Sequence, residues 1–214
     1  MKKKLIKWLG LTGLLALISY TAAVVFSPRA FPGYNWMAQA VSDLSAESAP
    51  SRMLWNQLSA VYGQFSLLCA VCVSIYVSEN RISSKLFRIG IYLFTVMNCV
   101  SAIGYTMFPL ADSGKEIASF QEVMHMVVTM LVVLLSIASL VILIIAGCRK
   151  AEVRRIWILA AIALAMMMIG AIGQSLVPPY YFGIVERFSV FAAVGFNAVL
   201  GLYLFEGFKM HQVK

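Results

Sequence analysis

The stretch VMHMVVTMLVVLLSIASLVILIIAG, residues 123–147, is a continuous apolar run without Asp, Glu, Lys or Arg. A helix needs about 20 such residues to cross the hydrocarbon core of a bilayer, so this run predicts a membrane-spanning helix. Five further runs flank it, at about residues 5–26, 54–77, 87–108, 156–177 and 188–206. We therefore predict an all-α integral membrane protein with six transmembrane helices in a single domain, residues 1–214.

The composition agrees with this class. Of the 214 residues, 61% are hydrophobic and 12% are charged, whereas about a quarter of residues are charged in soluble domains. Residues 1–25 also have the basic head, apolar run and small residues of a secretory signal, but the apolar run is long for that purpose. We expect an uncleaved first helix, and the topology downstream is the same in either case.

The basic residues predict the orientation. Of the 17 Lys and Arg residues, 13 fall on one side of the predicted bundle, and six of the nine acidic residues fall on the other. Because Lys and Arg favour the cytoplasmic flanks of membrane helices, both termini are predicted to be cytoplasmic, in a multi-pass protein of the plasma (inner) membrane. The net charge of +8 thus reflects topology, and it indicates neither a nucleic-acid nor a nucleotide partner.

The segment FPGYNWMAQAVSDLSAESAPSR, residues 31–52, connects the first two predicted helices on the extracytoplasmic side. An apolar stripe recurs in it at helical spacing: Trp36, Met37, Ala40, Val41 and Leu44. We predict a short interfacial helix here, with Asn35 as its N-cap and with Tyr34 and Trp36 at headgroup depth.

Polar residues are concentrated on the same side. At the level of the outer loops they are Ser42, Asp43, Asp112, Glu122, His125, Glu186 and Arg187. Deeper, within the predicted helices, come Asn56, Gln57, Gln64, Asn98, Gln174 and Asn197. Amides and charges are costly in lipid, so we expect these side chains to face the bundle interior or a wet cavity capped by residues 31–52.

Cys69 and Cys72 form a C-x-x-C pair that places both thiols on one face of the second predicted helix. A membrane thiol oxidoreductase needs such a pair at the extracytoplasmic end, whereas this pair lies past the middle toward the cytoplasm. We expect two small buried side chains rather than a redox centre.

One hypothesis for the outer residues is hydrolysis. His125, oriented by Asp43 or Asp112, would act as general base toward Ser42 or toward water. Arg187 would hold a phosphate or carboxylate headgroup through two hydrogen bonds. The G-x-S-x-G motif that positions the serine in many hydrolases is absent from the sequence.

A variant of this hypothesis places one divalent metal ion among His125, Asp43, Asp112 and Glu122, where it would activate water. Zinc usually takes more nitrogen or sulfur ligands than these residues offer. A hard ion such as Mg²⁺ or Ca²⁺ suits the carboxylates better.

The same residues also have structural interpretations. Ser42 and Asp43 would brace the interfacial helix through backbone hydrogen bonds. Arg187 would pair with an acidic residue and lock the helical hairpins together. His125 would only bind a loop carbonyl.

Several short motifs carry a family resemblance: YN at 34–35, SDLSA at 42–46 followed by AP at 49–50, FP-x-x-D at 108–112, His125, and ERF at 186–188. Over nearly the whole chain this pattern resembles the domain-of-unknown-function 998 family of six-helix bacterial and archaeal membrane proteins. The family more often has Gly where this chain has Ser45. The Ser-Asp pair after the first helix is also remotely similar to the Frag/DRAM/Sfk group, which includes a GPI-anchor lipid-remodelling factor.

The resemblance implies the six-helix fold and a set of matching positions, but no reaction. These positions are Tyr34, Asn35, Ser42, Asp43, Pro109, Asp112, His125 and Arg187.

Two functions follow as hypotheses. The first is an extracytoplasmic lipid-handling hydrolase or transferase, with Ser42, Asp43, Asp112 and His125 as catalytic residues and Tyr34, Asn35, Glu122 and Arg187 as substrate-binding residues. The alternative is a non-enzymatic lipid-binding, sensor or accessory membrane protein whose polar cluster is a structural network. Partners would be membrane lipid or another membrane protein. Transport is less favoured, because no predicted span is conspicuously broken in mid-membrane.

Overall fold

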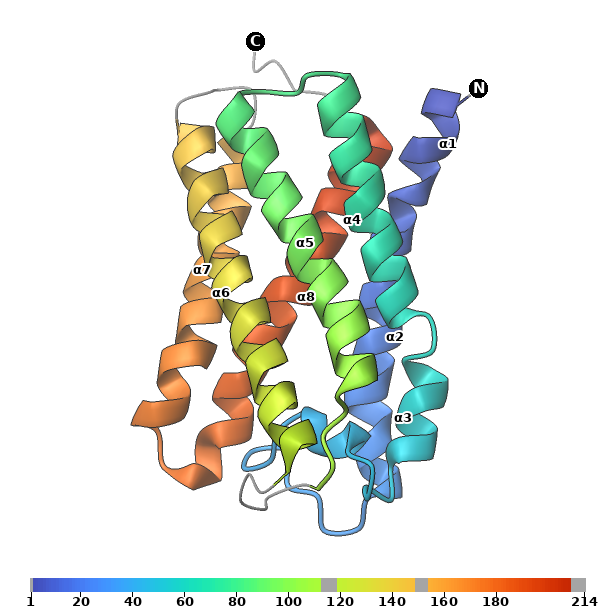
Figure 1. Cartoon of the computed structure of the whole chain (residues 1–214), viewed down its shortest axis with the longest axis vertical. Helices are drawn as coiled ribbons and strands as arrows, with labels where there is room; N and C mark the ends of the chain where they lie inside the picture. Colours follow the sequence, from blue (N-terminus) through green and yellow to red (C-terminus); the bar gives the residue numbers. More distant parts are fainter. Residues whose placement is uncertain (1, 113–118, 149–153, 209–214) are drawn as a thin grey trace.

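The computed structural model of the chain describes residues 2–112, 119–148 and 154–208, which form an upright bundle of helices (Figure 1). Six helical stretches are long and apolar enough to cross a membrane: Lys4–Ala30, Arg52–Glu79, Lys85–Met107, Phe120–Cys148, Arg155–Leu176 and Pro179–Glu206. Strands do not occur within the described ranges. The predicted all-α fold with six membrane-spanning helices is confirmed.

The first two spans each consist of two helices, α1 (Lys2–Leu9) with α2 (Leu11–Phe26), and α3 (Arg52–Leu58) with α4 (Tyr62–Glu79). The other spans are α5 (Lys85–Met107), α6 (Phe120–Cys148), α7 (Arg154–Leu176) and α8 (Phe182–Glu206). Short 3-10 helices cover Ser27–Ala30, Ser42–Ser45 and Pro179–Tyr181.

The two interruptions were not visible in the hydropathy pattern. The first span breaks at Gly10 and the second breaks at residues 59–61. Side-chain hydroxyls compensate at the second break, where Ser19 donates to the Leu58 carbonyl (2.6 Å) and Ser59 donates to the Trp55 carbonyl (2.7 Å). The first break lies about six residues from the start of its span, Lys4–Ala30, whereas the second lies seven to nine residues into the span Arg52–Glu79 and is nearer the middle of that span than its end.

Helix α8 is the central helix of the bundle. It packs against α1, α2, α4 and α7, while α5 packs against α4 and α6 (Figure 1). Half of its most apolar window is buried, compared with about a third or less for every other span. Residues near the start of α8 are therefore held in place from several sides.

The start of α1 and the end of α8 lie at the same end of the bundle (Figure 1). The Tyr76 hydroxyl donates to the Gly207 carbonyl there (3.2 Å), and the Trp8 ring packs edge-on against Phe205, with centroids 4.9 Å apart. The protein is thus a multi-pass membrane protein in which the start of α1 and the end of α8 lie on one side. That this side is cytoplasmic, and that the membrane is the plasma membrane, stay predictions from the basic residues.

The loop between the first two spans contains a helix, but a shorter one than predicted. Only Ser42–Ser45 is helical, and a turn at Asn35 precedes it. The Asn35 side chain accepts from the Met37 N–H (3.0 Å), and the Asn35 N–H donates to the Gln39 side chain (2.7 Å). The bond from Met37 is that of an N-cap, as predicted for Asn35, and the Ala38 and Gln39 N–H groups donate to the Asn35 carbonyl, so a single turn forms here. Val41 and Leu44 are fully buried, so the loop folds into the end of the bundle.

Candidate functional site

The loop of residues 31–51, called the cap loop below, is bonded to the first turns of α8. The Ile184 N–H donates to the Met37 carbonyl (3.3 Å), and the Val41 N–H donates to the Glu186 carboxylate (3.1 Å). The first N–H groups of a helix have no acceptor within the helix, so the loop supplies one. In return, α8 supplies an acceptor to the loop.

Arg187 makes most of the remaining contacts between these segments. Its Nη1 donates to the carbonyls of Trp36 (2.7 Å), Gln39 (3.1 Å) and Gly183 (2.7 Å), and its Nη2 donates to the Tyr34 hydroxyl (2.7 Å). The guanidinium also lies 6.0 Å from the centroid of the Trp36 ring. A guanidinium is a planar fork with five N–H donors, so this one side chain fixes three separate points of the cap loop.

Gly183 lets the cap loop approach α8 this closely. A Cβ atom at this position would collide with the carbonyl oxygens of Gln39 and Trp36 and would crowd Nη1 of Arg187. Gly183 lies one helical turn before Arg187, on the same face of α8. The carbonyl cluster around Arg187 therefore requires a residue without a side chain at 183.

We expect Tyr34→Phe to lower the free energy of unfolding by about 1–3 kcal/mol, because it removes an acceptor from charged Arg187 and a donor from a loop carbonyl. The Tyr34 hydroxyl donates to the Ala40 carbonyl at 2.8 Å. Burial raises the pKa of Tyr34, an effect that Arg187 opposes, so the phenol stays a neutral donor at neutral pH. Denaturant unfolding in micelles measures the change. Tyr180→Phe, at an exposed tyrosine, is the control; equal stability of both variants would contradict the prediction.

A shallow groove of about 280 Å³ opens between α7 and α8 beside the cap loop. Its surface is almost wholly apolar, and the residues that line it are Trp36, Met166, Ile184, Arg187, Phe188 and Phe191. The groove lies between two helices that are long and apolar enough to cross a membrane.

A family model described as a protein of unknown function, DUF998, matches residues 14–203, which include all or most of each span. The chain belongs to the DUF998 family. The resemblance predicted from the motifs is thus confirmed, whereas the remote similarity to the Frag/DRAM/Sfk group is not. No curated protein and no solved structure matches the chain.

In this DUF998 chain, His125 makes the contact that its structural interpretation predicts. It is 8% exposed, and its Nδ1 lies 2.9 Å from the Phe108 carbonyl at the end of α5. The Tyr105 ring packs beside it, with centroids 5.2 Å apart. Within the described part of the chain, no hydrogen bond joins His125 to Ser42. The serine and base of the predicted hydrolase are therefore not engaged with each other.

Asp43 and Ser42 belong to the folded cap loop. An oxygen of Asp43 accepts from the Ala40 N–H (3.1 Å), and the Ser42 carbonyl accepts from the Ser45 hydroxyl (2.9 Å). Asp43 is 8% exposed. The Asp43 side chain thus braces the backbone beside the 3-10 helix, whereas Ser42 contributes only its carbonyl oxygen.

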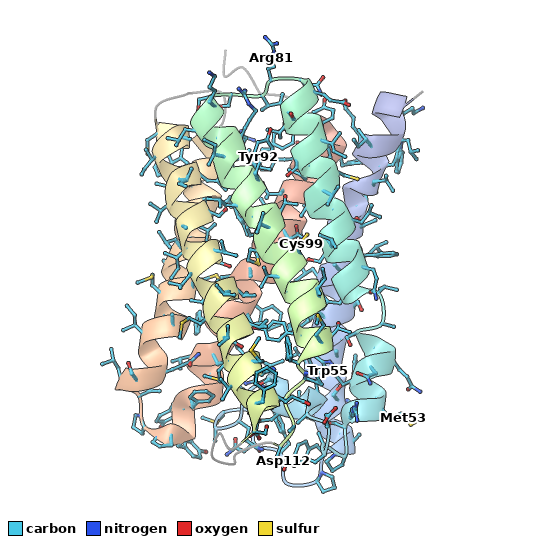
Figure 2. The ribbon with its side chains drawn as sticks, viewed as in Figure 1. Met53, Trp55, Arg81, Tyr92, Cys99 and Asp112 are labelled. Atoms are coloured by element: carbon cyan, nitrogen blue, oxygen red, sulfur yellow. The ribbon has the colours of Figure 1, made fainter. Side chains whose placement is uncertain are left out.

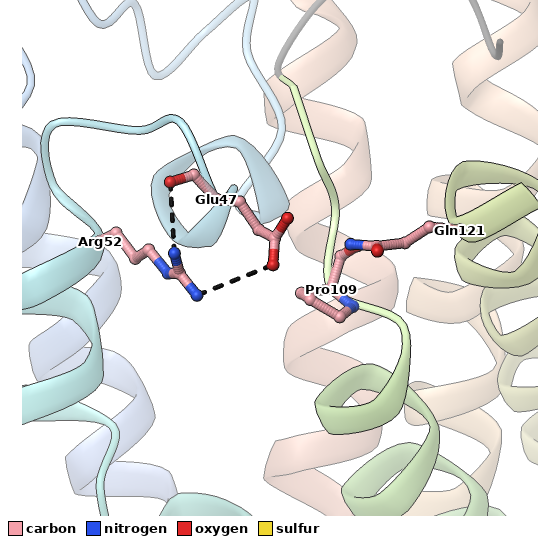
Figure 3. Close-up of polar contacts among 4 residues, drawn as sticks. All are labelled: Glu47, Arg52, Pro109 and Gln121. Atoms are coloured by element: carbon pink, nitrogen blue, oxygen red, sulfur yellow. Dashed lines mark hydrogen bonds and ion pairs between the residues drawn. The ribbon is translucent and has the colours of Figure 1, made fainter. Parts of the chain in front are cut away.

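The cap loop is also bonded to the connection that follows α5. The Glu47 and Ser48 N–H groups donate to the carbonyls of Leu110 (2.8 Å) and Ala111 (3.2 Å). Asp112 follows directly and lies at this end of the bundle (Figure 2). Nearby, Arg52 pairs with Glu47 at 3.8 Å, and the Gln121 amide donates to the Pro109 carbonyl at 2.9 Å; Figure 3 draws these four residues.

Glu122 has a local role at the start of α6. Its carboxylate accepts from the N–H and the hydroxyl of Ser119 (both 3.0 Å), and its own N–H donates back to the Ser119 hydroxyl (3.2 Å). This reciprocal pattern is a capping box. The S-x-x-E spacing that produces it was readable in the sequence, where Glu122 was instead assigned to substrate.

The residues proposed for a divalent metal are not gathered around one point. Among residues 2–112, 119–148 and 154–208, no three His, Cys, Asp or Glu side chains come close enough together to hold a metal ion. We derive no chemistry through a metal.

The deeper polar residues divide into two groups, which corrects the expectation that all face inward. Asn98 and Asn197 are buried and share the Ser66 hydroxyl, at 2.8 Å from each. In contrast, an exposed group points away from the bundle: Asn56, Gln57, Gln64 and Gln174. Hydropathy cannot separate the two groups, because it ignores which helix face a residue occupies.

Sequence reasoning also missed the groove and Gly183. The aromatic and Met side chains of the groove match ordinary lipid-facing residues in type. The one available signal was the four-residue spacing from Gly183 to Arg187, which places a glycine beside a charged side chain.

Proposed function

We propose that the protein binds a membrane lipid without chemically changing it, with an acyl chain in the groove between α7 and α8 and the headgroup anion at Arg187. The groove is the observation that carries the proposal, since its walls are apolar and Arg187 is among the residues that line it. Its volume of about 280 Å³ is slightly below the roughly 300–1,000 Å³ of pockets that enclose whole drug-sized ligands. It is thus suited to part of one chain.

The remaining hydrogen-bond capacity of Arg187 supports the headgroup contact. Its bonds to the described residues use both N–H groups of Nη1 and one of the two N–H groups of Nη2. A guanidinium has five N–H donors, so the Nε–H and the second Nη2–H are left for a phosphate or carboxylate oxygen. The partial positive charge at the start of α8 favours an anion at the same place.

The hydrolase or transferase hypothesis has less support from the geometry. Its proposed base, His125, binds the Phe108 carbonyl, and its proposed orienter, Asp43, binds the Ala40 N–H. The bonds of Tyr34 and Arg187 likewise hold the cap loop in place. A cluster whose members mainly support one loop favours the binding function over the catalytic one.

Met166→Trp should abolish lipid retention, because an indole projecting from α7 would fill the groove without touching the contacts between the cap loop and α8. Native mass spectrometry of the protein, released gently from micelles, reads the mass and the fraction of bound lipid. We expect the wild type to carry one lipid per chain and the variant to fall at least tenfold in occupancy, a loss of about 1.4 kcal/mol in binding free energy.

Ile162→Trp is the matched control, one turn away on the same helix and 53% exposed outside the groove. It should retain lipid like the wild type. A wild type without bound lipid, or equal retention in both tryptophan variants, would overturn the proposal. Turnover of the bound lipid that disappears in His125→Ala would favour the enzyme instead.

A further inference from the structure

One face of α3 and α4 points away from the rest of the bundle. From Val61, directly before α4, the exposed positions recur along α4 at steps of three, four and seven residues, and Figure 2 shows Met53 of α3 pointing outward at the end of this face. The positions are Met53 (74% exposed), Val61 (41%), Gln64, Leu68 (37%) and Ile75 (43%). Steps of three and four residues are the spacing of the contact seam between two supercoiled helices.

Gln64 on this face lies at hydrocarbon depth. Two contacts with α5 fix its level, from Ser66 to Asn98 (2.8 Å between side-chain oxygens) and from Tyr62 to Ser101. Gln64 is therefore level with residues 98–101, at least six residues before the end of α5. At 1.5 Å per residue this is about 10 Å inside the outer end of a helix that spans the core.

An amide at that depth requires a hydrogen-bond partner, because hydrocarbon offers none. Within the described residues the Gln64 side chain has no partner, whereas the amides of Asn98 and Asn197 are bonded inside the bundle. The exposed residues over the first half of α6 are apolar by comparison: Val123, Met126, Val127, Met130, Leu131 and Leu134. Gln64 thus marks the α3–α4 face as different from ordinary lipid-facing surface.

We propose that a second copy of this chain covers the α3–α4 face, with the two Gln64 amides bonded to each other across a two-fold axis. A side-chain amide is both donor and acceptor, so two identical amides satisfy one another. A two-fold interface brings identical residues together near its axis, which is the arrangement this pairing needs. Interhelical amide bonds of this kind stabilise helix association in membranes.

The rest of the face fits the same partner. Val61, Leu68 and Ile75 continue the seam on both sides of Gln64, so a second α4 can pack along it. Asn56 and Gln57, exposed on α3, extend the amide chemistry toward the outer surface. A single polar residue within an apolar seam also fixes the register of the two helices.

Gln64→Leu tests the proposal through the monomer–dimer equilibrium of the full-length protein, measured by dilution in lipid bicelles or mild detergent. We expect a dimer for the wild type and a dissociation constant about tenfold higher for the variant, the effect of losing interhelical amide bonds. Gln174→Leu removes an exposed amide from α7 and should leave the constant unchanged.

Cross-linking provides a second readout that does not depend on affinity. Gln64→Cys, in a background in which exposed Cys148 is replaced by alanine, should form an intermolecular disulfide in native membranes under mild oxidation. Ile162→Cys on α7 should not. A wild type that stays monomeric at every dilution would overturn the proposal. So would a dimer that is indifferent to Gln64→Leu, or cross-linking equal at both sites.

Discussion

Replacing Arg187 by methionine should lower the free energy of unfolding by about 3–5 kcal/mol, since it removes a charged donor whose two Nη1 hydrogens are shared among three carbonyls and whose Nη2 donates to Tyr34, and a hydrogen bond from a charged donor is worth roughly 1.5–3 kcal/mol. The loss of unfolding free energy stays below the sum of the individual hydrogen-bond energies, because the released loop regains hydrogen bonds with water. The carbonyls of Trp36, Gln39 and Gly183 and the Tyr34 hydroxyl lose their common donor. Denaturant unfolding in micelles gives the free energy, and limited proteolysis within residues 31–51 reports the loop itself.

Arg187→Lys separates charge from geometry in this experiment. Lysine keeps the positive charge but concentrates its donors on one nitrogen, so it cannot reach the carbonyl cluster and Tyr34 together. We expect it to recover only part of the lost stability and to leave the cap loop sensitive to protease. Full wild-type stability in the lysine variant would contradict the role of the guanidinium fork.

Gly183→Ala should cost about 2–3 kcal/mol of unfolding free energy, although alanine is about 1 kcal/mol better than glycine inside a helix. The added Cβ meets carbonyl oxygens of the cap loop and the Arg187 guanidinium, so the loop has to move away from α8. We expect a lower melting temperature together with faster cleavage in residues 31–51. The groove between α7 and α8 should also lose its Trp36 wall.

Gly195→Ala is the matched control for Gly183→Ala, because it lies in the same helix and a Cβ there meets no atom within 4 Å. It should leave stability unchanged or raise it slightly through helix propensity. If both variants behave alike, steric exclusion at Gly183 is not what seats the cap loop.

The bundle could be predicted because hydrophobic run length is a local property of the sequence. Six runs of about 20 apolar residues predict six spans, and this prediction does not depend on how the helices pack against one another. The breaks at Gly10 and at residues 59–61 could not be predicted, because they depend on tertiary acceptors such as the Leu58 carbonyl for Ser19. Similarly, the stripe from Trp36 to Leu44 fits a helix, but the turn that Asn35 caps does not continue, and only Ser42–Ser45 is helical.

The sequence predicted that several polar residues lie close together, but it did not predict which groups they bind. Charged and polar residues of the outer loops do gather at one end, since Glu186, Arg187 and Tyr34 all bind the cap loop. Their partners are mostly backbone carbonyls and N–H groups, whose directions no residue pattern reveals. For the Asn and Gln residues within the spans, the face of the helix on which each lies could have been read from its spacing to apolar neighbours. Gln64 shares a face with Leu68, whereas Ser66 shares one with Cys69 and Val73, which are buried.

The bonds between the cap loop and α8 join residues far apart in the chain, such as Trp36 and Arg187. Chains are synthesised and folded from the N-terminus onward, so the loop emerges long before its main partner exists. It can reach its final conformation only after the last span has been inserted. The cap loop, although synthesised early, is therefore among the last parts to fold. The time at which it becomes protected from protease during synthesis reports when α8 has packed into the bundle.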